Sequence, residues 1–153
     1  MNAAENLKKI NIKLPSAPNP VGSYVAYRIS EKLVFISGQI SLKSNGELIK
    51  GKVGLDLTLA QGQEAAHVCA INILSQVKAA CNGDLNKIEK CIKITGFVNS
   101  SNDFIDQPKV INAASELLVK VLEENGKHSR AAVSVNSLPL GAAVEIEAIF
   151  EIK

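Results

Sequence analysis

The sequence contains no tryptophan, and aromatic residues make up only 4% of its 153 residues. Few aromatic rings leave few platforms on which nucleic-acid bases could stack. The net charge of +2 comes from lysines that are spread along the chain rather than gathered in one basic cluster. A weak and dispersed positive charge does not form the footprint typical of nucleic-acid-binding proteins, so we do not expect nucleic acid as a partner.

The chain also lacks long apolar runs. No stretch approaches the roughly 20 apolar residues that cross a bilayer, and the polar N-terminus has no apolar core of a secretion signal. The three cysteines, Cys69, Cys81 and Cys91, are an odd number without close spacing. We therefore expect reduced thiols, no membrane association and a cytoplasmic location.

Motifs for cofactors and for covalent catalysis are missing as well. Neither His67 nor His128 has a second histidine or a cysteine at the spacing of a metal site. No serine lies in a Gly-x-Ser-x-Gly elbow, the turn that exposes the nucleophile of many hydrolases. We therefore expect a protein that works without a metal or another cofactor.

The apolar content, in contrast, is sufficient for a core. Hydrophobic residues make up 46% of the chain and charged residues 21%, which is typical of a folded protein. The length suits a single domain over residues 1–153. Residues 1–20 are expected to form an extended N-terminal arm, with a short amphipathic helical turn before Lys13 and three prolines after it.

Apolar periodicity predicts an alternation of strands and helices. One helix is expected to begin at Thr58, which fits a capping box with Gln61, and to end at Asn82-Gly83. A second is expected from Pro108 to Asn125-Gly126. Strands are expected over about 24–29, 33–40, 88–98, 131–135 and 143–152, with a short return strand over 47–49.

This order of elements predicts an α+β fold with a single mixed sheet and both helices on one face. The other face of that sheet would still carry Phe35, Phe97, Val133 and Ile149. Leaving these side chains in water would be unfavourable. We therefore expect this face to pack against other subunits.

Arg130 is one of only two arginines in the chain. It opens an apolar strand, where a permanently charged guanidinium needs a partner, and its planar fork suits a carboxylate. Glu145 on the next strand is one candidate, because strands adjacent in sequence often form a hairpin. The carboxylate of a small ligand is another. Glu145 and Glu147 could equally be a solvated pair on an exposed strand.

Several segments together resemble one known family in their order along the chain. They are 17–24, 35–40, Phe97-Val98-Asn99 with Asn102-Asp103-Phe104, and Ser129-Arg130 through Leu138-Pro139 to 144–149. This combination is similar to the Rid/YjgF family of reactive-intermediate deaminases, also named endoribonuclease L-PSP. The resemblance covers nearly the whole chain, which looks like a long branch of the family. It implies a chorismate-mutase-like fold and a homotrimer with a central β-barrel and a cleft between neighbouring subunits.

The resemblance also implies an activity. Family deaminases hydrolyse enamines and imines such as 2-aminoacrylate to 2-oxo acids and ammonia. By position, Arg130 would bind the carboxylate of the substrate, and Glu145 would position or activate the attacking water. An imine is already electrophilic, so orientation, an anion clamp and one water would be sufficient. The residues implied to line the cleft are Tyr24, Ser37, Gly38 and Asn102.

The chain departs from the family pattern next to the arginine. Ala131 replaces the usual serine, and Ala132 replaces a frequent cysteine; Ser23 and residues 26–28 also differ. These changes favour an alternative, in which the cleft binds a small carboxylate-bearing metabolite without turnover and serves in sensing or partner binding. RNA cleavage is a third hypothesis, but no histidine pair, metal set or basic aromatic groove supports it.

Overall fold

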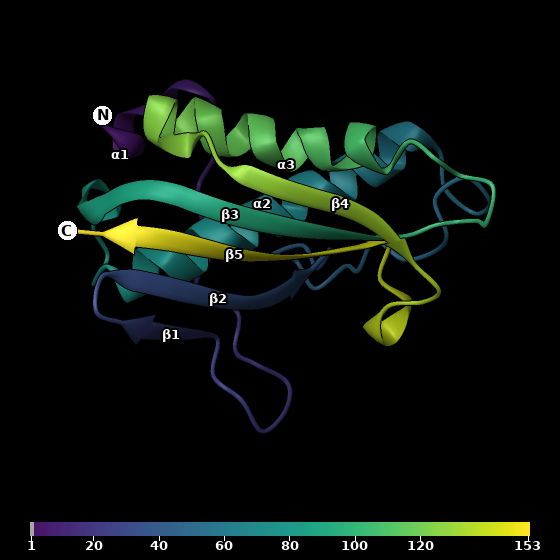
Figure 1. Ribbon diagram of the computed structural model, residues 1–153, viewed down its shortest axis with the longest axis horizontal. Coiled ribbons are helices and arrows are strands. Elements are labelled where there is room, and N and C mark those ends of the chain that lie inside the picture. The colour runs from purple at the N-terminus through teal and green to yellow at the C-terminus, as the bar shows by residue number, and fades with distance from the viewer. Residues whose placement is uncertain (1) are drawn as a thin grey trace.

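The computed structural model describes residues 2–153, and within them five strands form one mixed sheet with the order β1-β2-β5-β3-β4 (Figure 1). The elements are α1 (Ala3–Lys9), β1 (Tyr27–Ser30), β2 (Leu33–Ile40), α2 (Leu59–Ala80), β3 (Ile88–Asn99), α3 (Gln107–Leu122), β4 (Ser129–Val135) and β5 (Val144–Ile152). Three short 3-10 turns, η1 (Leu85–Lys87), η2 (Glu123–Gly126) and η3 (Pro139–Gly141), connect them.

The pairing of the strands decides where the charged residues lie. β3 and β4 are parallel, with α3 as the crossover between them, and the other neighbouring pairs are antiparallel. β5 pairs with β2 on one side and with β3 on the other. The hairpin considered for β4 and β5 is therefore wrong. The segment through η3 takes the chain past the end of β3, so β5 occupies the other edge of that strand (Figure 1).

The ends of the two long helices follow local chemistry. The Thr58 hydroxyl accepts from the Gln61 amide at 3.2 Å, and the Gln61 side chain accepts from the Thr58 amide at 2.8 Å, so the predicted capping box is present. α2 ends at the predicted position, where Gly83 has a φ of 89°. α3 ends earlier than predicted, because Glu123 takes the left-handed conformation with a φ of 56°. Gly126 is needed instead for close packing, since a Cβ there would overlap the Leu118 carbonyl.

Helices α2 and α3 cover one face of the sheet, as predicted. Every second residue of β5, from Val144 to Phe150, is buried on this face. α3 lies so close to β3 that a Cβ at Gly96 would meet the Ile111 side chain at 2.5 Å. The core therefore lies between this face and the two helices.

The opposite face of the sheet remains open in the single chain. Phe35 is 42% exposed and Val133 is 44% exposed, and Phe35 pairs with Ile149 across β2 and β5. Exposed apolar side chains gathered on one sheet face are typical of a surface that another protein covers. That subunits of the same chain pack here stays a prediction.

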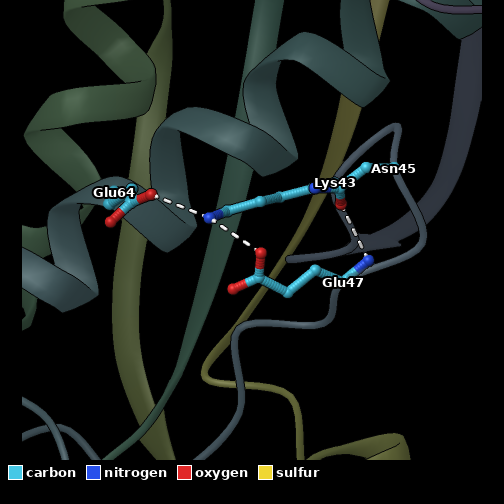
Figure 2. A network of polar contacts seen from close by, with 4 residues as sticks. All are labelled: Lys43, Asn45, Glu47 and Glu64. Carbon is cyan, nitrogen blue, oxygen red and sulfur yellow. Dashed lines mark hydrogen bonds and ion pairs between the residues drawn. The ribbon is translucent and has the colours of Figure 1, made fainter.

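The arm and the turn after β2 are fastened to the helices. α1 forms as the expected helical turn, and the Asn6 side chain donates to the Val121 carbonyl at 3.1 Å. The predicted return strand over 47–49 is reduced to one bridge between residues 42 and 48. Lys43 connects this turn to α2 through an ion pair with Glu64 at 3.2 Å, and it forms a second ion pair within the turn with Glu47 at 3.5 Å (Figure 2).

Candidate functional site

A cavity of about 680 Å³ lies where the N-terminal arm passes the ends of β2 and β5. Its walls are formed by residues 18–26 before β1, the end of β2 with residue 42, and the turn at η3, together with Asn72 of α2 and Glu145 of β5. Four of the six predicted site residues line this single cavity, namely Tyr24, Ser37, Gly38 and Glu145. Segments that are far apart in the sequence therefore meet at one place.

Glu145 lies against the backbone of β2 at Gly38. The register of β2 against β5 shifts between Ile36 and Gln39, which marks a bulge. A Cβ on Gly38 would overlap the Glu145 carboxylate oxygen. A side chain at position 38 would therefore force the Glu145 carboxylate to move from this place, so Gly38 allows the carboxylate to lie against β2.

The environment of Glu145 favours its protonated form. The side chain is half-buried, and burial is the main cause that raises its pKa above the ordinary value; the negative charge of Glu147 raises it further. Among residues 2–153, no hydrogen bond or ion pair satisfies the Glu145 carboxylate. A half-buried carboxylate with a raised pKa and no partner is suited to accept a proton or to hold a water.

Tyr24 and Ser37 lie at the junction of the arm with β2. The Ser37 hydroxyl donates to the Val25 carbonyl at 2.6 Å, and the Ser37 amide donates to the Ala26 carbonyl at 2.9 Å. The Ser37 hydroxyl has thus given its proton away and can only accept from a ligand. Tyr24 is 52% exposed and lies in the segment between the arm and β1 rather than in the predicted strand, since β1 begins at residue 27.

A buried amide pair, which the sequence did not reveal as part of the site, fixes the arm over the cavity. Gln76 on α2 is only 1% exposed. Its amide donates to the Pro18 carbonyl at 2.7 Å and lies 3.5 Å from the Gln39 amide oxygen. Gln39 in turn donates to the Ser37 carbonyl at 2.9 Å. The sequence does contain one indication of this pair, a glutamine inside the apolar stripe of a helix, because a buried polar group there requires a partner.

Arg130 lies outside the cavity. It pairs with Ile94 of β3, whereas Glu145 pairs with Phe97 on the other edge of the same strand. The strand β3 thus separates the two, so Glu145, one of the two candidate partners, does not pair with Arg130 within one chain. The guanidinium contacts α3 instead: Nη1 donates to Asn112 Oδ1 at 2.8 Å and to Ser115 Oγ at 3.2 Å, and Nη2 donates to the Pro108 carbonyl at 3.4 Å.

Asn102 also lies away from the cavity. It is exposed in the turn after β3 and does not line the cavity. The polar groups that do line the cavity are the side chains of residues 19, 24, 37, 39, 72 and 145. None of these is a lysine or an arginine, so residues 2–153 of one chain offer no cation to a carboxylate bound in the cavity.

The remaining reactive side chains do not add to this site. The three cysteines are free and buried, and burial raises the pKa of Cys91 to about 12, which keeps it a thiol. Within residues 2–153, no three histidine, cysteine, aspartate or glutamate side chains gather in a way that could hold a metal ion. In the same part of the chain, no helix is long and apolar enough to cross a membrane.

Comparisons with known proteins give the relatives of this chain. Protein TCP17 of Trypanosoma cruzi is 43% identical over 150 residues, which cover 97% of this chain and 93% of that protein. The 2-iminobutanoate/2-iminopropanoate deaminase of Homo sapiens is 28% identical over 139 residues, covering 90% of this chain and 86% of the human protein. The crystal structure of Atu1372, a protein of unknown function from Agrobacterium tumefaciens, is 47% identical, with a TM-score of 0.91 over 99% of this chain and 94% of that one.

The match to the YjgF/chorismate mutase-like family model agrees with these relatives. It extends over residues 5–151, which is nearly the whole chain. The mixed sheet with helices on one face agrees with the chorismate-mutase-like fold that the motifs implied. The chain therefore belongs to the YjgF/chorismate mutase-like family, also called Rid, as its sequence motifs predicted.

Proposed function

We propose that the protein hydrolyses reactive enamines or imines of small amino acids, of the 2-aminoacrylate type, to 2-oxo acids and ammonia. The observation that carries this proposal is the Glu145 carboxylate, half-buried in a cavity, without a partner and with a raised pKa. The name of the human relative supports the class of reaction. A small substrate that is already electrophilic requires little more than orientation and an activated water.

The proposed chemistry uses Glu145 as a base and as an acid on a substrate whose imine nitrogen is protonated. As water attacks the imine carbon, the carboxylate accepts one water proton and the new carbon–oxygen bond forms, which gives a carbinolamine. The carboxyl then returns this proton to the amine nitrogen. As the carbon–nitrogen bond breaks, the carboxylate accepts the remaining hydroxyl proton, the carbonyl forms, and ammonia leaves with that proton as ammonium. Because its pKa is raised toward the working pH, Glu145 is a stronger base than an exposed carboxylate and a usable acid in the second step. Tyr24 and Ser37 would orient the substrate from the rim.

In this proposal the carboxylate of the substrate binds Arg130 of a neighbouring subunit. The cavity of one chain contains no cation, and Arg130 lies at the edge strand of the sheet. A homotrimer that covers the open sheet face would bring the β4 edge of one subunit to the cavity of the next. Such a site would be complete only in the oligomer.

The proposal is tested by generating imines in the assay with an amino-acid oxidase. Wild-type protein should accelerate the release of ammonia and 2-oxo acid, and Arg130→Ala should lose most of this acceleration. If wild-type protein accelerates no imine of a panel with small and large side chains, the enzymatic function is ruled out. If Arg130→Ala is as active as wild type, the assigned clamp is wrong.

One observation favours a second function, the binding of a small carboxylate without turnover. Ala131 and Ala132 beside Arg130 provide neither a hydroxyl nor a thiol, and Ala132 packs against the core. In this alternative, 2-oxo acids would raise the melting temperature of a protein that shows no hydrolysis. The absence of any thermal shift with such acids would remove the basis for it.

A further inference from the structure

A chain of hydrogen bonds links the Gly126 carbonyl, His128 and Ser115 of α3 to the Arg130 guanidinium. Arg130 Nη1 donates to Ser115 Oγ at 3.2 Å. Ser115 Oγ and His128 Nε2 are 2.9 Å apart, and His128 Nδ1 lies 2.6 Å from the Gly126 carbonyl oxygen. A second acceptor, Asn112 Oδ1, lies 2.8 Å from the same Arg130 nitrogen.

The direction of each bond in this chain of hydrogen bonds is determined by the carbonyl at its end. The Gly126 carbonyl can only accept, so Nδ1 of His128 carries the hydrogen, and Nε2 of the neutral ring must accept. Ser115 therefore donates to His128 and turns a lone pair toward Arg130. The pKa of His128 agrees with a neutral ring: burial lowers it most, the bond to Gly126 opposes this, and the charge of Arg130 lowers it further.

These contacts leave one edge of the guanidinium open. Both hydrogens of Nη1 are used, by Asn112 and Ser115. Nη2 has one long contact of 3.4 Å to the Pro108 carbonyl. Among residues 2–153, neither the Nε hydrogen nor the second Nη2 hydrogen of Arg130 has a partner. The guanidinium edge formed by Nε and Nη2 is the one that can bind a carboxylate with two parallel bonds.

We propose that Asn112, Ser115 and His128 are positioning residues that hold Arg130 with its open edge toward the carboxylate of a bound imino or 2-oxo acid. They do not touch the ligand and act only through Arg130. The inference rests on the function proposed for this site, since it takes Arg130 as the carboxylate receptor. It adds a helix and a histidine to a site that the sequence motifs place on strands and loops.

The test is a binding measurement with 2-oxobutanoate by calorimetry, together with steady-state kinetics on imines. Ser115→Ala should weaken binding and raise KM about three- to tenfold, the range of one net hydrogen bond, with little change in kcat. Ser115→Thr retains the hydroxyl and should restore most of the affinity. His128→Leu should cause a smaller loss, because the Ser115 hydroxyl then merely becomes free to rotate.

A double-mutant cycle separates positioning from a general structural role. In an Arg130→Ala background, Ser115→Ala should cause no further loss, because its effect passes through the guanidinium. Ser129→Ala is the matched control: this neighbouring hydroxyl donates to the Ile92 carbonyl at 3.0 Å and does not contact Arg130. It should leave binding and kinetics unchanged.

The outcomes distinguish this inference from the proposed function. If wild type binds 2-oxobutanoate but hydrolyses no imine, the enzymatic function fails, and the positioning role is supported when Ser115→Ala weakens that binding. If Arg130→Ala abolishes binding while Ser115→Ala binds as wild type does, the positioning role is overturned. It is also overturned if wild type binds no carboxylate, or if Ser115→Ala causes the same loss with and without Arg130.

Discussion

The two charged groups of the candidate site have opposite environments. Glu145 lies in the cavity without a partner, and burial raises its pKa. Arg130 lies at the edge of the sheet, where α3 provides three acceptors for its guanidinium. In the proposed mechanism, the proton acceptor therefore has no partner within residues 2–153, whereas the carboxylate clamp is held by three acceptors. Only the clamp would be oriented by its own chain before substrate binds, as electrostatic preorganisation requires.

The largest effect is expected at Glu145. Glu145→Gln should lower kcat about 10² to 10⁴-fold, because the amide cannot accept the proton of the water. The same change should raise the melting temperature at neutral pH. The folded-state pKa of Glu145 is above its unfolded value, so its ionised form opposes folding at neutral pH, and this penalty disappears as the pH falls through the raised pKa.

Glu151→Gln is the control for this pair of effects. Glu151 is on the same strand and the same face, but it forms an ion pair with Lys90 at 3.1 Å. Loss of the Glu151 carboxylate should leave activity unchanged and should not stabilise the protein. A Glu145→Gln variant that is both active and less stable than wild type would contradict the environment described for the cavity.

Arg130→Lys should have the next largest effect. Lysine keeps the charge but loses the planar fork, so it cannot hold Asn112 and Ser115 on one side and a carboxylate on the other. We expect KM to rise about tenfold or more, with a nearly unchanged melting temperature. Equal KM values for the lysine variant and wild type would mean that charge alone is sufficient and that the contacts with α3 have no role in binding.

Gly38→Ala tests how closely the cavity holds Glu145. The added methyl would overlap the carboxylate and displace it. A displacement of this kind should lower kcat about 10- to 100-fold while binding through Arg130 remains intact. Calorimetry with a 2-oxo acid measures the second part, and a large loss of binding instead of turnover would show that Glu145 and Arg130 do not act separately.

The smallest expected effect is a change in pH dependence. Glu147 raises the pKa of Glu145 by its charge, so Glu147→Gln should shift the acid limb of the kcat/KM profile to lower pH. The maximal rate should change little, since Glu147 is exposed and does not line the cavity. An acid limb that remains in place would assign it to a group other than Glu145.

The sequence predicted those features that depend on local chemistry. The capping box at Thr58, the left-handed stop at Gly83 and the alternation along β5 are set by residues a few positions apart, and all three are present. Of the six residues that the family motifs implied for the cleft, four line one cavity, and Arg130 and Asn102 lie outside it. The roles of all six stay a prediction.

The sequence did not predict features that depend on which strand edges meet. β4 and β5 are consecutive along the chain, yet β3 lies between them, so Arg130 and Glu145 do not pair within the chain. Nothing local indicates that Ser115 would face Arg130, because that contact follows from the crossover through α3. The contact between Gln76 and Pro18 could not be predicted either, because the sequence shows Gln76 only as a polar residue in the apolar stripe of a helix.

Mixing two inactive variants tests most directly whether Arg130 and Glu145 act in one site across subunits. Arg130→Ala and Glu145→Gln would be co-expressed with different tags, and oligomers that carry both tags would be purified. If the oligomer is the proposed trimer, about one site in three of each mixed trimer would combine an intact Arg130 with an intact Glu145 of its neighbour. We predict recovery of roughly that share of wild-type activity in the mixed oligomers. Mixed oligomers with no more activity than either variant alone would contradict a shared site.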